Sequence, residues 1–418
     1  MQRTLINIER RHAVGFCLAV ALFELLTYMA SDMIMPAMLL ITDEFAADTR
    51  HVPNAFNLYL IGGICLQWLI GPLSDRFGRR PLLLLGSALF ALACAAALLT
   101  QTIEAFNVLR LIQGLGLGFV VAVSYPALQE VFCEADAVRL MALLGNVALL
   151  SPLLAPLLGS VLLEWLSWRQ LFLGLSVAAT LAWLGLFISM PETVGTPRRD
   201  GRVLAPVAFA FKHLRQRYCA LLRNPLFVCA SLALGLMSLP LIAWIGLAPL
   251  LLMHLHGVTA LEYGLWQIPV FSAVIVGNLI LHRLLSSCSL RRLIRRALWP
   301  YCCGLLLLLA SAFAGDSFSW TVAALAVYAV GLGMSNAALY RLALFASDDS
   351  KGLMSAMIGM FSIAVMGAGG ALIASFGGGN SLQVFALSVT AAGLLCLPFL
   401  HRVLRDGSCT PDSLSSTQ

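Results

Sequence analysis

The sequence predicts an all-α membrane protein with about twelve transmembrane helices in two six-helix halves. The chain of 418 residues is 60% hydrophobic and only 11% charged, which is more apolar than a soluble domain of this size. Apolar stretches of about 20 residues, long enough to cross a bilayer as helices, recur along its whole length. The longest polar stretch, about 191–224, divides these spans six and six, as in transporters built from two parallel repeats.

The hydrophobic pattern sets the boundaries of the predicted elements. We expect spans at about 14–36, 53–73, 81–101, 105–130, 138–163, 168–190, 226–252, 262–284, 293–314, 318–345, 353–376 and 380–401. The predicted domains are an N-terminal half (1–190), a cytoplasmic linker (191–225), a C-terminal half (226–405) and a disordered tail (406–418). Within the linker, residues 205–222 predict a basic amphipathic helix on the membrane surface.

Basic residues predict the orientation in the membrane. Nearly all arginines and lysines fall on one side of this map, and the other side has only Arg50 and Arg169. The positive-inside rule therefore places both termini and the central linker in the cytoplasm. The net charge of +6 reflects this topology and does not indicate nucleic-acid binding. The first apolar run is too long for a cleaved signal, and the eleven cysteines lack metal-binding spacing, so we expect no metal.

Two carboxylates lie within the first span, at Glu24 and Asp32. An ionisable group at membrane depth costs several kcal/mol and usually marks an ion or substrate pathway. Eight residues apart on a helix, the two are separated by about 12 Å along the axis and about 80° around it. They share a broad face without touching, and Tyr28 lies between them, where its ring can stack on a cationic ligand. The alternative is that both are structural acids whose oxygens are satisfied by hydrogen bonds within the protein.

Arg110 lies early in the fourth span and precedes Gln113 and Gly114. A buried arginine keeps its proton, so it needs partners, for which Glu24, Asp32, Gln113 or a substrate are the candidates. Burial and a nearby cation act in opposite directions on a carboxylate's affinity for a proton, a balance that suits proton exchange. A structural ion pair or a snorkelling arginine is the alternative.

The loop between spans two and three is rich in glycine and basic residues. We expect Asp75 there to pair with a basic side chain or with the N-terminal end of another helix, holding the cytoplasmic side shut. A loop that serves only to fix topology is the alternative. The residues of this gating motif are Gly71, Asp75, Arg76, Gly78, Arg79 and Arg80.

Prolines and glycines mark two further helices. Pro152 and Pro156 remove two backbone donors from one face of span five, which predicts a bend or a locally rigid segment. Gly114 and Gly118 favour close helix packing in span four. Methionines and aromatic residues in spans seven and eleven can repack around ligands of different shape, although such residues are more often part of the core.

These motifs resemble those of the drug:proton antiporters of the major facilitator superfamily. The resemblance rests on the Asp75 loop, on Arg110 with Gln113 and Gly114, and on residues 152–159; it extends over essentially all spans, with segments 24–32, 238–244, 262–269 and 344–352 the most similar. It implies a bacterial inner-membrane transporter that is a monomer, uses protons and no other cofactor, and binds small-molecule drugs. It assigns proton coupling to Asp32, Glu24 and Arg110, and a helix-bend antiporter motif to Pro152, Pro156 and Gly159. It places these residues in the drug pocket: Tyr28, Ser31, Asp32, Asn146, Leu239, Ile242, Gly359 and Met366.

Two positions depart from the resembled pattern. Ala155 precedes Pro156 where the antiporter motif usually has glycine, and Ser31 precedes Asp32 where the resembled transporters have asparagine. The first change affects the expected bend and the second affects which drugs bind.

The sequence therefore predicts a proton-coupled multidrug exporter that acts by alternating access. It would export lipophilic cationic and neutral compounds, such as ethidium-like and chloramphenicol-like molecules. A narrow exporter of one metabolite or one antibiotic is the second hypothesis. A membrane-embedded enzyme or receptor is the third, although no catalytic or ATP-binding motif supports an enzyme or a primary pump.

Overall fold

The computed structural model describes residues 4–199, 201, 203–206, 211–285, 288–313, 317–347 and 351–405. Its regular elements within these residues are helical, and twelve candidate spans are long and apolar enough to cross a membrane. Each predicted span overlaps one of them, which confirms the all-α fold class and the number of spans. The tail after Arg405 and its predicted disorder lie outside the described residues.

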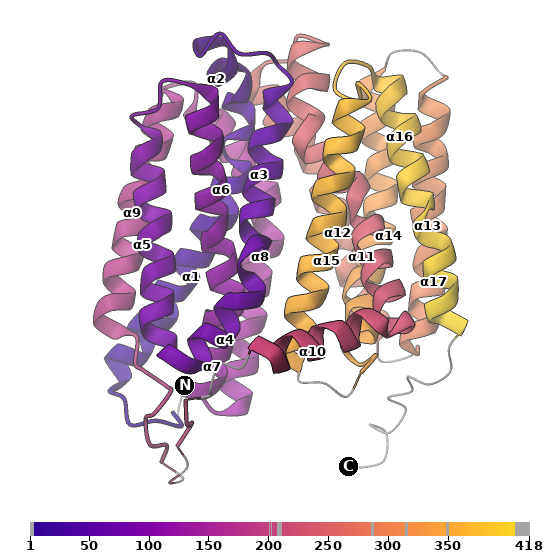
Figure 1. Ribbon diagram of the computed structural model, residues 1–418. Helices are drawn as coiled ribbons and strands as arrows, with labels where there is room; N and C mark the ends of the chain where they lie inside the picture. Colours follow the sequence, from indigo (N-terminus) through magenta and orange to yellow (C-terminus); the bar gives the residue numbers. More distant parts are fainter. Residues whose placement is uncertain are drawn as a thin grey trace. The chain divides into compact units, whose positions relative to one another are not determined.

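The elements follow one another along the chain as labelled in Figure 1. The first set, up to residue 189, is α1 (Arg10–Asp32), η1 (Met35–Ala37), α2 (Met38–Glu44), α3 (His51–Cys65), α4 (Gln67–Phe77), α5 (Arg79–Ala97), α6 (Ile103–Phe119), η2 (Val120–Ser124), α7 (Tyr125–Val131), α8 (Glu134–Leu162) and α9 (Trp168–Ser189). The second set is α10 (Phe211–Arg223), α11 (Pro225–Ala248), η3 (Pro249–His254), α12 (Ala260–Leu284), α13 (Leu290–Ser311), α14 (Phe318–Leu344), α15 (Lys351–Ser375), α16 (Leu382–Leu394) and α17 (Cys396–Arg405).

The chain forms two compact units. Unit 1 comprises Met1–Phe209 and Ile245–Ile268, and unit 2 comprises Ala210–Trp244 and Pro269–Gln418. The predicted domain boundaries, at 190/191 and 225/226, stay a prediction.

Glycines allow the helices of unit 1 to approach closely. A Cβ atom added to Gly114 on α6 would lie 2.0 Å from the carbonyl oxygen of Tyr59 on α3, and one added to Gly118 would lie 2.7 Å from that of Gly63. Such spacing leaves room only for glycine, so the helix-packing interpretation of Gly114 and Gly118 is confirmed. In the same unit α1 packs on α8 and α9, and α5 packs on α6 and α9.

Two spans of unit 1 change helix type along their length. The first span leaves α-helical geometry after Asp32, where the 3₁₀ segment η1 contains Pro36, because proline has no N–H to continue the ladder. The fourth span passes through the π-helical segment η2 just before Tyr125 and Pro126. In contrast, α8 stays helical through Pro152 and Pro156.

Tyrosines tie the helices of unit 2 together. The hydroxyl of Tyr301 on α13 donates to the carbonyl oxygen of Gly393 on α16 at 2.9 Å, and the hydroxyl of Tyr328 on α14 donates to that of Met237 on α11. The two rings contact each other with centroids 5.2 Å apart. Lipid cannot form hydrogen bonds with these polar groups, so they bond to one another. The bonds therefore fix the relative positions of α11, α13, α14 and α16.

The linker helix differs from the prediction at its first two residues. We predicted a helix over 205–222; α10 extends over Phe211–Arg223, residues 205 and 206 are not helical, and residues 207–210 lie outside the described residues. Pro206 explains part of the error, because proline disfavours helical geometry in the residue before it. After α10, the side chain of Asn224 accepts hydrogen bonds from the backbone N–H groups of Leu226 and Phe227 and so caps α11. Figure 1 shows α10 crossing the direction of the long helices of unit 2.

Candidate functional site

The two carboxylates of the first span are buried in unit 1. Glu24 is 0% exposed and Asp32 is 3% exposed. One oxygen of Glu24 accepts a hydrogen bond from the hydroxyl of Tyr125 at 2.7 Å, whereas its other oxygen, Oε2, has no hydrogen-bond partner within the described chain. Asp32 accepts a bond from the hydroxyl of Ser31 at 2.6 Å. Buried polar atoms are rarely left unsatisfied, and an exception often marks a functional group.

Arg110 on α6 is fully buried and bonds to neutral oxygens. Its Nη1 donates to the carbonyl of Ala30 and to Oε1 of Gln113, both at 2.9 Å. Its Nη2 donates to the carbonyl of Ser31 and its Nε to that of Ala55, both at 3.3 Å. The fixed fork of donors on a guanidinium allows one side chain to bond to three helices in this way.

Tyr59 and Gln113 hold this guanidinium in place. The centroid of the Tyr59 ring lies 4.7 Å from Cζ of Arg110, a cation–π contact that is strengthened by burial. The Tyr59 hydroxyl donates to the carbonyl of Thr27, and Nε2 of Gln113 donates to the carbonyl of Ala93 on α5 at 3.3 Å. These three residues, Arg110, Tyr59 and Gln113, form the Arg110 cluster, which connects α1, α3, α5 and α6.

The end of α1 provides two of the oxygens that bind Arg110. The last turn of a helix has carbonyls without helical partners and a partial negative charge, which favour a nearby cation. None of the ion pairs found between described residues includes Arg110, Glu24 or Asp32. Among the predicted partners, Gln113 is bonded to Arg110 and the two carboxylates are not.

The predicted antiporter motif on α8 lies against the end of α1 at Gly159. A Cβ atom added to Gly159 would be only 2.1 Å from the carbonyl oxygen of Met33, the residue that follows Asp32. Any larger side chain would push α8 away from this turn. Pro156, one turn earlier on the same helix, accepts a hydrogen bond from Ser160 through its carbonyl at 2.7 Å.

The predicted drug-pocket residues divide between the two units. Unit 1 holds Tyr28, Ser31, Asp32 and Asn146, and unit 2 holds Leu239, Ile242, Gly359 and Met366. In unit 1, Asn146 is exposed on α8 and Tyr28 is half-buried on α1. In unit 2, Leu239 is buried against α15, where a Cβ atom on Gly369 would be 2.5 Å from its methyl carbon.

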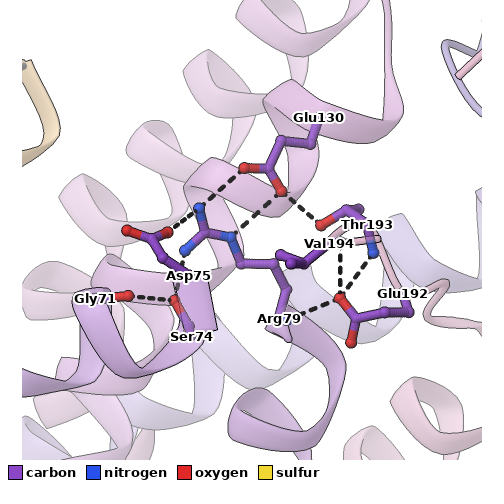
Figure 2. Close-up of polar contacts among 8 residues, drawn as sticks. All are labelled: Gly71, Ser74, Asp75, Arg79, Glu130, Glu192, Thr193 and Val194. Atoms are coloured by element: carbon purple, nitrogen blue, oxygen red, sulfur yellow. Dashed lines mark hydrogen bonds and ion pairs between the residues drawn. The ribbon is translucent and has the colours of Figure 1, made fainter. Parts of the chain in front are cut away.

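The gating motif surrounds a second buried arginine, Arg79 (Figure 2). Its guanidinium forms ion pairs with Asp75 at 2.5 Å and with Glu130 at 2.9 Å, and it donates to the hydroxyl of Ser74. That hydroxyl donates in turn to the carbonyl of Gly71 at 2.7 Å. Two carboxylates thus neutralise a side chain that is 10% exposed, and the pairing of Asp75 with a basic side chain is the one that the sequence predicts.

The predicted loop is in fact reduced to one residue, Gly78, because α4 and α5 extend up to it from both sides. Gly78 has φ +104°, and a Cβ atom there would lie 2.3 Å from Oε2 of Glu192. The Glu192 carboxylate accepts hydrogen bonds from the backbone N–H groups of Arg79 at 2.9 Å and Arg80 at 3.2 Å. It therefore caps the N-terminus of α5, and Figure 2 shows Thr193 linking the same segment to Glu130.

Sequence reasoning missed several members of both clusters. Tyr59 and Tyr125 carry no signal of function among other aromatic residues in apolar spans. Glu130 and Glu192 do carry one, because each is an acidic residue at the end of a span, and Glu192 is followed by the basic Arg198 and Arg199. Of the remaining motif residues, Arg76 is exposed, and Arg80 donates to the carbonyl of Phe187 at 2.7 Å.

Comparisons with known proteins agree with the arrangement of helices. Residues 20–374 match the family model of the Major Facilitator Superfamily. The chain is 42% identical to the multidrug transporter MdfA of Edwardsiella ictaluri, over 97% of this chain and 98% of that protein. It is also 42% identical to MdfA of Escherichia coli, over 95% of each. Among solved structures, a D-xylose-proton symporter superposes with a TM-score of 0.72 at 16% identity, covering 93% of this chain and 98% of the other.

Proposed function

This chain belongs to the Major Facilitator Superfamily, and we propose that it is a proton-coupled multidrug exporter. It is a multi-pass membrane transporter and not an enzyme. Its proposed cargo is lipophilic cationic and neutral compounds, which leave the cell in exchange for protons. We place it as a monomer in the bacterial inner membrane, with both termini in the cytoplasm, from the distribution of basic residues and from its likeness to bacterial multidrug transporters.

One observation carries the proposal: the first span buries two carboxylates in the same unit as a buried arginine with which neither forms a salt bridge or hydrogen bond among the described residues. Glu24 has an unpartnered oxygen, and Asp32 follows directly after two residues whose carbonyls bind Arg110. A proton arriving at or leaving either acid changes the net charge of this enclosed site, where charge is expensive. Structural acids would be expected to have their oxygens satisfied.

The proposed cycle uses Asp32 as the main protonation site and Glu24 as an accessory one. On the outward side Asp32 takes up a proton, and its attraction for Arg110 and for a cationic drug weakens. On the inward side drug binding favours release of that proton. A ligand shifts such an equilibrium only through different interaction with the two states, and the charge of Asp32 supplies that difference. Arg110 would transmit the change in charge at Asp32 to other helices, because its guanidinium bonds to the last turn of α1, to α3 and to Gln113 on α6.

Drug recognition is proposed for eight residues from the two units. Tyr28 and Asp32 would attract cationic drugs through an aromatic face and a negative charge. Leu239, Ile242 and Met366 would give a flexible apolar surface for drugs of different shape. The other members are Ser31, Asn146 and Gly359.

The gating motif around Arg79 is proposed to stabilise one state of the transporter. Its ion pairs with Asp75 and Glu130 join α4, α5 and α7, and Glu192 extends the cluster to the segment after α9. The helix-bend motif, with Pro152, Pro156 and Gly159, is proposed to move α8 against the break after α1.

Transport by everted membrane vesicles tests the proposal. An imposed pH gradient, without added nucleotide, should drive uptake of ethidium and of chloramphenicol, and dissipating the gradient should stop it. Asp32→Asn should reduce this uptake to the level of vesicles that lack the transporter, with unchanged expression. Gradient-driven uptake at the wild-type rate by Asp32→Asn would remove the coupling role. Uptake of neither compound by the wild-type protein would favour the narrow exporter of one metabolite or one antibiotic.

A further inference from the structure

A pocket of about 370 Å³ lies between α13 and α17 in unit 2. Three basic side chains line it: Arg295 from α13, and His401 and Arg405 from α17. Four leucines, one from α13 and three from α17, form the rest of its wall. A basic rim on an apolar wall has the chemistry of a site for an amphiphilic anion.

The three basic groups are available to a ligand. All three are exposed, and none of them forms a side-chain hydrogen bond or ion pair within the part of the chain that the structure describes. Neither α13 nor α17 contains an acidic residue, so the two helices that line the pocket carry only basic charged groups. Guanidinium groups match the geometry of phosphate oxygens and bind them in pairs of hydrogen bonds.

The helices that form the pocket are held together firmly. Tyr301 on α13 donates to the carbonyl of Gly393 at 2.9 Å, and Thr390 on α16 donates to the carbonyl of Leu305 on α13 at 3.2 Å. Because α17 follows α16 after one residue, these bonds also fix the position of α17. The spacing of Arg295 from His401 and Arg405 is therefore set by the fold rather than by a loop.

Exposed apolar side chains lie close in sequence to the residues that line the pocket. Trp299, one turn after Arg295 on α13, is 76% exposed, and Leu395, just before α17, is 58% exposed. Exposed tryptophans mark the interface between lipid tails and headgroups, and arginines near that level reach toward the headgroups. On the proposed orientation this is the cytoplasmic leaflet, where attraction between anionic lipids and basic segments is strong.

We propose that this pocket binds an anionic phospholipid of the cytoplasmic leaflet. Its phosphate would accept hydrogen bonds from Arg295 and Arg405, with His401 beside them, and its acyl chains would lie along the leucines. The site is separate from the buried carboxylates of unit 1. It depends on the proposed orientation in the membrane but not on the proton-coupled cycle.

Lipid binding to the purified full-length protein tests the proposal. Delipidated transporter in detergent would be titrated with dioleoylphosphatidylglycerol, with zwitterionic dioleoylphosphatidylcholine and with inorganic phosphate, and bound molecules would be counted by native mass spectrometry. We expect the anionic lipid to bind at least about tenfold more tightly than the zwitterionic lipid. Equal binding of the two lipids would overturn the proposal. So would displacement of the anionic lipid by millimolar phosphate, which would identify a site for free anions.

Matched variants separate the pocket from general surface charge. The triple variant Arg295→Gln, His401→Gln, Arg405→Gln should weaken binding of the anionic lipid at least about tenfold. The control His282→Gln, Arg292→Gln, Arg402→Gln removes the same types of side chain from exposed positions of unit 2 that do not line the pocket, and should change binding less than about threefold. An equal loss in both would show diffuse attraction and overturn the site.

A gain-of-binding variant keeps the test valid if the triple variant does not fold. His401→Arg adds a permanent charge at an exposed position, so it should bind the anionic lipid several-fold more tightly while its elution volume and unfolding temperature stay unchanged. Unaltered or weaker binding by folded His401→Arg would contradict the placement of the phosphate.

Discussion

The two buried arginines of unit 1 are held in opposite ways. Arg79 is neutralised by the carboxylates of Asp75 and Glu130. Arg110 is more deeply buried, yet its hydrogen bonds go to carbonyl and amide oxygens. Removing one partner of a buried ion pair leaves an uncompensated charge and is strongly destabilising, whereas a charge held by neutral oxygens depends on no single carboxylate. From this difference we infer a stabilising role for the Arg79 cluster and keep the proposed coupling role for the Arg110 cluster.

Replacing Arg110 should give the largest effect of all. Arg110→Lys keeps the positive charge but cannot span three carbonyls and Gln113 with a single ammonium group. We expect ethidium efflux to fall to the level of cells without the transporter, although the protein still reaches the membrane in amounts within about twofold of wild type. Efflux by Arg110→Lys near the wild-type rate would show that charge alone suffices, and would remove the contrast between the clusters.

Breaking the Arg79 cluster should affect stability instead. Glu130→Gln removes one of the two ion pairs of Arg79, and hydrogen bonds to charged groups contribute about 1.5–3 kcal/mol each. We expect a lower unfolding temperature in detergent, with proton release per folded molecule preserved. Glu164→Gln is the control, because Glu164 is exposed and has no salt bridge within the described chain. Identical unfolding temperatures for the two variants would contradict the stabilising role of Glu130.

Replacing Tyr125 should have a smaller effect on efflux, and it tests whether this residue positions Glu24. Tyr125→Phe removes the hydroxyl that donates to Glu24, so the ionised acid would lose a charge-assisted bond. We expect efflux to fall by about threefold to tenfold and stability by about 1 kcal/mol. Tyr328→Phe removes a comparable buried hydroxyl from unit 2 and should lower stability similarly without slowing efflux. Equal efflux by both variants would count against Tyr125 as a positioning residue.

The fold follows from patterns that are local in the sequence. Twenty apolar residues predict a span wherever they occur, and Pro36 accounts for the end of α-helical geometry after Asp32. The pair of Asp75 and Arg79 was also predictable, because its members are four residues apart on adjoining helical segments. The linker helix was placed less well, since its polar boundary has no apolar pattern to fix it.

The clusters themselves were only partly predictable, because their bonds join distant residues. Tyr125 lies 101 residues from Glu24, and Glu192 lies 113 residues from Arg79. Arg110 bonds mostly to backbone carbonyls, which every residue has, so no residue type marks its partners. Burial and charge identified Glu24, Asp32 and Arg110 as special, but their contacts required the packing of four helices.

Drug-evoked proton release tests the central claim that the carboxylates of the first span exchange protons with the solvent. Purified transporter in weakly buffered detergent would receive ethidium and then chloramphenicol, while a pH indicator records released protons. We expect release with both compounds from the wild-type protein, a strong reduction in Asp32→Asn, and wild-type release from Glu164→Gln. Undiminished release from folded Asp32→Asn, or no release from the folded wild-type protein, would contradict this claim.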